Sequence, residues 1–339
     1  MKKIVVAVAV IAIVLLGLPP VLGVQTEARV RERVAALDRN GIVSMKVKSF
    51  ERGWFHSRAK IELGLAQNYL ARVGASSTPA AGLLDRQATI AVDFAHGPLS
   101  LQKGVHVGWS TMVARLDPET EGLANIEQVL GVPYLFEFRG RTGLTGGVAF
   151  DADVPPIDVS TGPEFKFSGA TLNGSYEGDR LLSNAHIESV EISEPAGTFT
   201  LRNLRLKTDN QFIGQDLAPG TGAFSIEKMS AASPLLGGKP MFESDRLSVV
   251  ATSTLNAART LLDMQLEYGV DRAHLEDNEV TGAAFGLALR NVDVETLQHY
   301  NETMRELVTN PTEDPGTAII ATLQADLPRL LAAGPKLVF

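Results

Sequence analysis

The sequence contains no cysteine, and this absence excludes several classes of protein at once. Without cysteine there is no disulfide scaffold, no cysteine-ligated zinc or iron–sulfur site, no thiol catalysis and no lipid-modified N-terminal cysteine. Glycine and proline, with 31 and 17 residues in 339, are in ordinary use, which excludes collagen-like and low-complexity classes. Because 45% of the residues are hydrophobic and 21% are charged, we expect most of the chain to fold around a core.

The chain also lacks an excess of positive charge. Its formal net charge is −8, and its isoelectric point is about 5.4. Nucleic-acid binding needs clustered Lys and Arg, so we expect no nucleic-acid partner. One local basic cluster has two interpretations, the wet face of paired strands, which we favour, or a contact with anionic lipid. It consists of Lys46, Lys48, Arg52, Arg58 and Lys60.

Long hydrophobic runs are absent except at the N-terminus. Lys2 and Lys3 precede an uncharged stretch of 21 residues from Ile4 to Val24. At about 1.5 Å per residue, this stretch nearly crosses a hydrocarbon core of about 30 Å. We interpret residues 1–24 as an uncleaved signal anchor. The alternative is a cleaved signal peptide, although Val21-Leu22-Gly23 fits a cleavage site poorly. In both cases the two lysines stay cytoplasmic and the rest is exported.

The exported part begins with a predicted membrane-proximal helix over residues 25–41, followed by a β-rich domain over 42–339. Val30, Val34 and Leu37 recur at helical spacing, and Asn40-Gly41 supplies a stop signal. From residue 42 onward, apolar and polar residues alternate, which is typical of antiparallel strands with one wet face. The predicted strands lie around 43–47, 58–63, 88–94, 104–115, 133–140, 143–151, 164–176, 184–193, 197–207, 223–230, 245–255 and 285–289.

Helical spacing returns in three places. Residues 119–130 predict one helix, Asp293 is expected to cap a second, and Pro315 to open a third with a kink at Pro328. In the third helix we expect Ile319, Leu323, Leu327 and Leu330 on one face. The predicted fold class is therefore α+β and mainly β. It is a large antiparallel sheet system with a few packed helices, preceded by one N-terminal transmembrane helix. We find no convincing repeat and no strong linker.

Two short motifs carry a family resemblance. Arg52-Gly53-Trp54-Phe55-His56-Ser57-Arg58-Ala59 is followed, after about forty residues, by His96-Gly97-Pro98-Leu99. With the lysine-led anchor and the short charged helix, this order resembles the YdgA-like family of bacterial envelope proteins, whose domain has no assigned function. The residues that carry the resemblance are Arg52, Gly53, Trp54, Phe55, Ser57, Ala59, His96, Gly97 and Pro98.

The resemblance implies a Gram-negative protein anchored in the inner membrane with most of its chain in the periplasm. It also implies further strands after the Gly334-Pro335 segment, so we expect this chain to be shorter than its family at the C-terminus. No catalytic residues come with it. From the residues alone, we read both motifs as structural: Gly53 permits a tight bend, Trp54 and Phe55 pack at a sheet edge, and His96 ties a turn.

A search for chemistry returns little. The six histidines have no tight metal spacing, and a pairing of His96 with His106 and Asp93 is a weak candidate metal site. Nucleophile-elbow and phosphate-binding glycine patterns are absent. We predict no catalytic residues, no metal and no cofactor.

Three functions remain open. The first is non-enzymatic binding or scaffolding in the cell envelope, with an envelope protein as partner. The second is carriage of a lipid or another hydrophobic ligand in an amphipathic β-groove. The third, least favoured, is hydrolysis of an envelope polymer by paired acids, of which Glu137 or Asp151 would be one.

Overall fold

The computed structural model describes residues 23–32, 34–35, 43–65, 88–97, 99–100, 106–117, 130–160, 164–213, 217–233, 240–275, 278–309 and 315–339. Most of the predicted membrane anchor (1–22), most of the helix expected over 119–130, and Pro98 lie outside these ranges. Within them, no helix combines the length and the apolar composition that crossing a bilayer requires. The prediction of a mainly β fold with antiparallel sheet and a few helices is confirmed.

The chain divides into two compact units, and the division falls inside one strand. Strand β8 (Val148–Val154) belongs to unit 1 up to Asp151 and to unit 2 from Ala152. Unit 1 contains Met1–Ile126, Tyr134–Asp151 and Val308–Pro311, and unit 2 contains Glu127–Pro133, Ala152–Leu307 and Thr312–Phe339.

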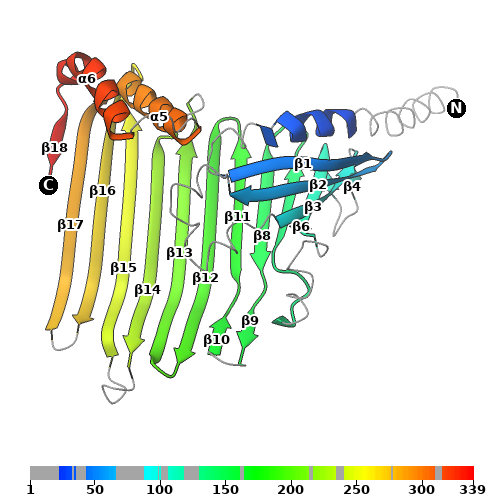
Figure 1. The fold of residues 1–339 in the computed structure, drawn as a ribbon, viewed down its shortest axis with the longest axis horizontal. Coiled ribbons are helices and arrows are strands. Elements are labelled where there is room, and N and C mark those ends of the chain that lie inside the picture. The colour runs from blue at the N-terminus through cyan, green and yellow to red at the C-terminus, as the bar shows by residue number, and fades with distance from the viewer. Residues whose placement is uncertain are drawn as a thin grey trace, which may run out of the picture. The chain divides into compact units, whose positions relative to one another are not determined.

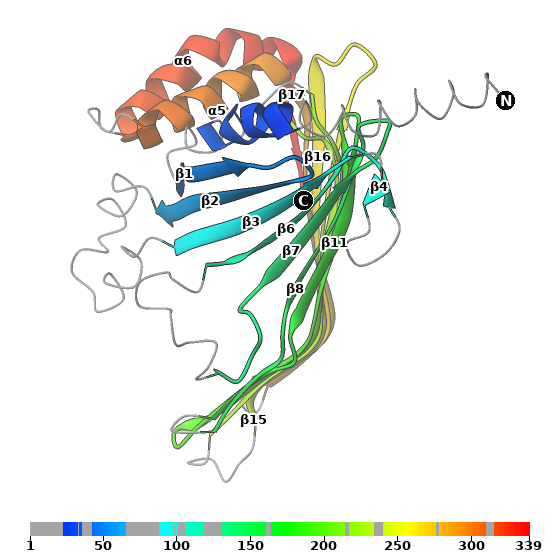
Figure 2. The ribbon, with the colours of Figure 1, turned by 90° about the vertical axis from the view of Figure 1, so that its right-hand side faces the viewer.

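Unit 1 is a helix beside an antiparallel sheet. The helix covers residues 23–35 apart from position 33, which is not described, and Figures 1 and 2 show it running along β1. The sheet has the order β1-β2-β3-β6-β7-β8, and β4 and β5 form a separate ribbon. The strands are β1 (Val43–Arg52), β2 (His56–Leu65), β3 (Ala88–His96), β4 (Leu99–Ser100), β5 (His106–Val107), β6 (Ser110–Leu116) and β7 (Glu137–Thr142).

The core of unit 1 lies between this helix and the sheet. Val34 of the helix packs with Ala59 and Ile61 of β2, with Phe94 of β3 and with Ala114 of β6. On β2 the buried residues Ser57, Ala59 and Ile61 alternate with more exposed ones, as expected for a strand with one wet face. The apolar side of these strands therefore forms a core, because the helix covers it.

Unit 2 is built from long strands. Its sheet has the order β8-β11-β12-β13-β14-β15-β16-β17-β18, while β10 pairs with β12 and β9 with β10. Figure 2 shows that the long strands bend along their length. The bounds are β9 (Ile157–Val159), β10 (Glu164–Phe167), β11 (Ala170–Glu177), β12 (Arg180–Glu194), β13 (Gly197–Gln211), β14 (Gly220–Ala232), β15 (Pro240–Leu255), β16 (Leu261–Leu275), β17 (Asn278–Asp293) and β18 (Lys336–Val338).

Two helices follow β17, and Figure 1 shows them at the end of the sheet where β17 leads into the first. Helix α5 (Val294–Thr309) begins after Asp293, whose Oδ1 accepts a hydrogen bond from the Thr296 amide at 2.9 Å. The predicted cap is thus confirmed. Helix α6 (Pro315–Ala333) begins at the predicted proline.

The expected apolar face of α6 is only partly covered. Ile319 and Leu330 are half-buried, whereas Leu323 and Leu327 are exposed together with Ile320 and Leu331. The side turned to α5 carries buried Asp326, which lies 3.1 Å from Nδ1 of His299. At helical spacing, this polar contact lies on the same side of α6 as the half-buried Ile319 and Leu330.

Candidate functional site

The two family-like motifs meet in unit 1, on neighbouring strands. Ser57 of β2 lies opposite Phe94 of β3, which brings the Ser57 hydroxyl within 2.8 Å of Nε2 of His96. Both side chains are only 4% exposed. The hydrogen bond therefore explains why the motifs occur as an ordered pair: each supplies one half of a buried polar contact.

The other motif residues surround this contact in different ways. At Gly53 an added Cβ would lie 2.4 Å from the carbonyl oxygen of His56, so the bend leaves no room for a side chain. Gly97 has a φ of 132°, a conformation that favours glycine. Ala59 is fully buried in the core, whereas Trp54 and Phe55 are exposed. Arg52 lies 3.1 Å from Glu27 of the helix.

The environment of His96 is that of a neutral imidazole. Burial, with a smaller contribution from the charge of His56, lowers the pKa of His96. Its Nδ1 is buried and has no hydrogen-bond partner. A catalytic serine–histidine pair needs a third group that orients the imidazole through this nitrogen. The pair is also closed from one side by the helix, because a Cβ at Gly23 would lie 3.7 Å from the Ser57 hydroxyl. The geometry fits a structural tie rather than a nucleophile.

The two acids considered for hydrolysis, Glu137 and Asp151, are joined by one arginine. Glu137 is fully buried and pairs with Arg115 and Arg139. Nη1 of Arg139 also lies 3.2 Å from the half-exposed carboxylate of Asp151. Both carboxylates are thus neutralised by guanidinium groups, and Arg115 further lies over the ring of Tyr134 at 5.5 Å. This arrangement is an ion-pair network around a buried carboxylate, in which removal of one partner would leave a charge uncompensated.

The basic cluster of unit 1 is matched by acids. Ion pairs of 2.7 to 3.1 Å join four of its five members to carboxylates. The pairs are Lys48–Glu62, Arg52–Glu27, Arg58–Asp93 and Lys60–Asp117. Neutralised in this way, the cluster fits the wet face of paired strands, as favoured from the sequence, better than a lipid-binding patch.

The weak metal candidate is not assembled. Asp93 is engaged by Arg58 at 2.8 Å, and His106 lies on the separate ribbon β4–β5. In the described part of the chain, no group of three or more His, Asp or Glu residues is close enough to hold a metal ion.

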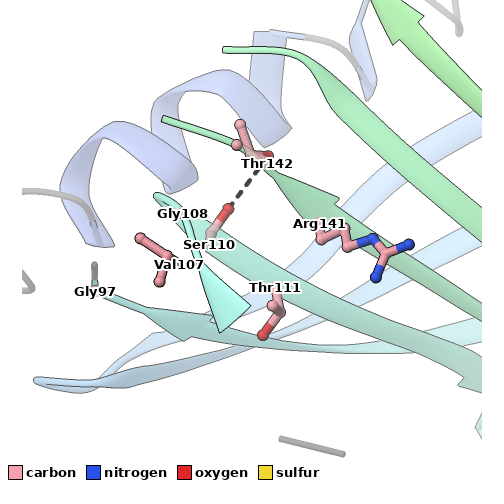
Figure 3. Close-up of a pocket in the computed structure, with 8 residues that line it drawn as sticks. Gly97, Val107, Gly108, Ser110, Thr111, Arg141 and Thr142 are labelled. Atoms are coloured by element: carbon pink, nitrogen blue, oxygen red, sulfur yellow. Dashed lines mark hydrogen bonds between the residues drawn. The ribbon is translucent and has the colours of Figure 1, made fainter. Parts of the chain in front are cut away.

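A small cavity in unit 1 is lined by the start of β6, the end of β7, Val107 of β5 and Gly97 after β3 (Figure 3). Its volume is about 50 Å³, which is far below the several hundred Å³ of typical ligand pockets. Ser110 and Thr142 contribute hydroxyls that lie 3.5 Å apart. The cavity can hold water molecules but has no room for an acyl chain.

The apolar sides of the long strands in unit 2 are left largely uncovered by the described residues of that unit, and one row of residues divides them. In each of the five strand pairs from β12–β13 to β16–β17, the pairing is interrupted at this row by one pair of opposed residues. One residue is passed over on each strand, so the register is the same on both sides of the row. On alternate strands, Asn203, Arg246 and Gly282 have φ values of 51°, 49° and 62°. We call this row the switch line: Glu188, Asn203, Glu227, Arg246, Asp271 and Gly282.

The apolar side of the sheet changes at the switch line. On β14, Ile226 and Met229 flank the line and are three residues apart, and because side chains alternate along a strand they point to opposite faces. The strand register aligns Ile226 and Met229 with equivalent residues on the other strands from β12 to β17, so the apolar side changes face at the same place on each of them. Between the line and α5, one apolar row contains Ile187, Leu204, Ile226, Leu247, Val270 and Ala283.

On the helix side of the line, the apolar face leads into a core. Leu262 and Val292 pack there with Leu217 and with Val294 at the start of α5. Nearer the line, Tyr268 and Phe285 of the same face are exposed and lie 6.3 Å apart. This half of the sheet is thus covered only at its far end by described residues.

Beyond the line, the apolar residues form a distal band on the other face. Its members are Ile157, Val159, Phe165, Phe167, Val190, Ile192, Phe199, Leu201, Met229, Ala231, Phe242, Ala273, Leu275 and Val280. They lie on eight strands, β9, β10 and β12 to β17, so at about 4.8 Å per strand spacing the band is about 34 Å long. All of its members are half-buried or exposed, Leu275 to 59%.

The sequence analysis did not predict the switch line, although the sequence contains a recurring feature at its position. At the line, β12, β14 and β16 carry an acid after Ile or Val, as in Ile187-Glu188, Ile226-Glu227 and Val270-Asp271. The strand pairs β12–β13, β14–β15 and β16–β17 therefore carry the same feature at equivalent positions of the sheet. The connections between the strands differ in length, so these positions have no constant spacing in the sequence, and the register was needed to align them.

Comparison with known proteins gives one result. A family model described as "Bacterial protein of unknown function (DUF945)" matches residues 1–338. No curated protein and no solved structure matches the chain. The match spans nearly the whole sequence and agrees with the domain of unknown function expected from the two motifs, while the YdgA-like name stays a prediction. The chain therefore belongs to this family of bacterial proteins of unknown function.

Proposed function

We propose that this protein is a non-enzymatic binding protein of the bacterial envelope. In this proposal the N-terminal segment anchors it in the inner membrane, most of the chain lies in the periplasm, and an envelope protein is its partner. The observation that supports it is the distal band, an apolar surface about 34 Å long that no described residue of unit 2 covers. Soluble domains seldom expose contiguous apolar surface of this extent without a binding role.

We propose no enzymatic reaction, because neither of the two candidate sites offers a group that could carry one out. The Ser57–His96 pair lacks a group at Nδ1 of the imidazole, and Glu137 and Asp151 are both held by Arg139. Neither arrangement offers a free nucleophile or a free general acid. Binding is therefore the better supported function for this chain.

The distal band also favours a second candidate, carriage of a lipid. It carries no charged side chain, it is two residue rows wide, and its length exceeds the roughly 15 Å that one leaflet of acyl chains spans. An acyl chain lying across the strands would contact apolar groups along its whole length. The two candidates share one surface and differ in what occupies it.

Site-specific photo-crosslinking of the full chain in living cells separates them. A photoreactive amino acid replaces Leu275, which lies in the distal band, and in a matched protein it replaces the adjacent His274, which points to the opposite face. Binding through the band predicts adducts from position 275 and few from 274. A discrete protein adduct supports the scaffold, and a lipid adduct identified by mass spectrometry supports the carrier.

Equal yields from the two positions, or no adduct from either, would contradict the use of the band. The substitution Leu275→Glu gives a second readout. It should abolish adduct formation from a photoreactive group at Phe242 in the same band, whereas His274→Glu should leave that adduct intact.

A further inference from the structure

The strands of unit 1 share one end with the start of the helix 23–35. The turn 53–55 joins β1 to β2, and the register places the end of β3, the start of β6 and the end of β7 at the same end. The small cavity of Figure 3 lies there too. A Cβ at Gly23 would lie 3.8 Å from the carbonyl oxygen of Gly53. The first turn of the helix therefore meets the connections that follow β1, β3 and β7.

Large apolar side chains are exposed at this end of unit 1. Among the residues of unit 1 that the structure describes, all exposed large hydrophobic side chains are found here. They come from the start of the helix, from the β1–β2 turn, from β5 and from the β7–β8 turn. Their exposure is thus a property of this end and not of the whole sheet. We call this set the apolar tip: Val24, Trp54, Phe55, Val107 and Leu144.

Both tryptophans of the chain also lie at this end. Trp54 is exposed in the turn, and Nε1 of Trp109 donates to the carbonyl oxygen of Leu144 at 2.9 Å. Tryptophan is enriched where a membrane meets water, because its ring is apolar and its N–H is polar. An uncharged surface enters that region without the cost of burying a charge. The segments at this end contain no Asp, Glu, Lys or Arg: 23–26, 53–55, 107–111 and 142–148.

We propose that the apolar tip inserts into the surface of the membrane in which the N-terminal segment is anchored. The predicted anchor ends at Val24, so its last residue is itself part of the tip. Because this connection is covalent, the tip stays close to the bilayer surface whenever the anchor spans the membrane, and weak apolar contacts are then sufficient. Unit 1 is thereby attached to the membrane at two points, the anchor and the tip.

The inference goes beyond the proposed function, because it concerns unit 1 and not the distal band, although it takes the membrane anchor from that proposal. The basic cluster has no part in it, since four of the five members are paired with acids. Contact through uncharged residues predicts insertion into zwitterionic lipid, with little dependence on salt.

The test uses tryptophan fluorescence, because the native probes already lie at the tip. The full chain with Trp109→Phe keeps Trp54 alone and is reconstituted into phosphatidylcholine vesicles. In a matched protein both tryptophans are replaced by Phe, and Lys46→Trp places the probe at an exposed position of β1, about 20 Å from the end of that strand. Phosphatidylcholine brominated in the upper part of its acyl chains quenches tryptophans that reach the bilayer.

Brominated lipid should lower the emission of Trp54 at least about twofold, since interfacial apolar groups lie about 5–10 Å deep at the boundary of headgroups and acyl chains. The probe at position 46 should be unaffected. Leu144→Glu adds a charge to the tip and should weaken the quenching of Trp54, whereas high salt should not. Equal quenching at positions 54 and 46, or none at 54, in protein that floats with the vesicles would overturn the inference and leave the anchor intact. Protein that does not float with the vesicles would overturn the anchor, and the inference with it.

Photo-crosslinking in living cells tests the choice of occupant. A photoreactive amino acid at position 54 of the full chain should give lipid adducts, and the same group at position 46 should give few. A discrete protein adduct from position 54, in place of lipid, would overturn the membrane as occupant in favour of an envelope protein.

Discussion

Unit 1 and unit 2 use the same alternating sequence pattern with different results. In unit 1 the apolar side of the strands is covered by the helix 23–35, and Ala59 and Phe94 become nearly inaccessible. In unit 2 the apolar rows of long strands stay half-buried or exposed over most of their length. Alternation thus specifies a strand with an apolar side, but only a second layer turns that side into a core.

The largest effect is expected from the buried carboxylate of unit 1. Glu137→Ala should lower the free energy of unfolding by about 3–5 kcal/mol, because it breaks an ion pair whose carboxylate is fully buried and leaves Arg139 with only the half-exposed Asp151. Chemical denaturation measures the change. Asp151→Asn is the control, since this carboxylate is half exposed, and it should cost less than about 1 kcal/mol. Similar costs for both would show that the network is not buried as described.

Two phenylalanines compare the covered and the uncovered apolar faces directly. Phe94→Ala in unit 1 should cost about 3–5 kcal/mol, because it opens a cavity in the core. Phe285→Ala in unit 2 removes a ring that is already 53% exposed and should cost about 1 kcal/mol, mostly from its contact with Tyr268. Thermal unfolding of both variants gives the comparison. If Phe285→Ala were as costly as Phe94→Ala, a layer would have to cover the unit 2 face in solution.

The stability of unit 1 should fall as the medium is acidified. The pKa of His96 is lowered from 6.5 by burial and by His56, so below about pH 6.5 the unfolded chain binds a proton that the folded chain excludes. The free energy of unfolding should therefore decrease from pH 6.5 down to the folded pKa and level off there. Unfolding by denaturant at pH 7.5 and 5.5 measures this. In His96→Gln the corresponding part of the pH dependence should disappear, and an unchanged slope would contradict the assignment.

A smaller effect of opposite sign is expected in the distal half of unit 2. Ser244 is buried among the apolar residues of the band, and its hydroxyl has no hydrogen-bond partner. Ser244→Ala should leave stability unchanged or raise it by up to about 1 kcal/mol, because an unsatisfied polar group is removed. Ser233→Ala is the matched control and should be destabilising, since that hydroxyl donates to the carbonyl oxygen of Ala196. A clear loss in Ser244→Ala would indicate a partner for this hydroxyl.

The smallest change is expected at Trp54. A buried tryptophan here would cost about 3–5 kcal/mol on truncation, but Trp54 is 57% exposed. Trp54→Ala should therefore shift the free energy of unfolding by about 0.5 kcal/mol or less. A near-neutral result would make Trp54 a candidate surface contact. A loss of several kcal/mol would place it in a packed environment.

Local signals were sufficient for much of the fold. Asp293 and Pro315 marked the starts of α5 and α6 because capping and the fixed φ of proline depend on a few neighbouring residues. Alternation located most strands but missed β16, although Leu262, Met264 and Leu266 follow the pattern. The covered face of α6 was predicted only in part, because helical spacing defines an apolar stripe without indicating what lies against it.

The candidate sites were less accessible to sequence reasoning. The two motifs were recognised, yet the contact between Ser57 and His96 depends on the register of β2 and β3. Glu137 and Asp151 were noted as acids, and only their positions on neighbouring strands showed that Arg139 joins them. The switch line was missed, because its residues are aligned by strand pairing and not by a constant spacing.

The sequence by itself determined the strand-rich character, the net negative charge, the exclusion of cysteine chemistry and the starts of the two C-terminal helices. These properties follow from composition and from contacts within a few residues. The tertiary structure decided which apolar rows are covered, which charges are paired and where the apolar side of the sheet changes face. These properties depend on the register between paired strands. A shift of one residue exchanges the two faces of a strand, and the residues within one strand do not indicate which residues of the next strand lie opposite them.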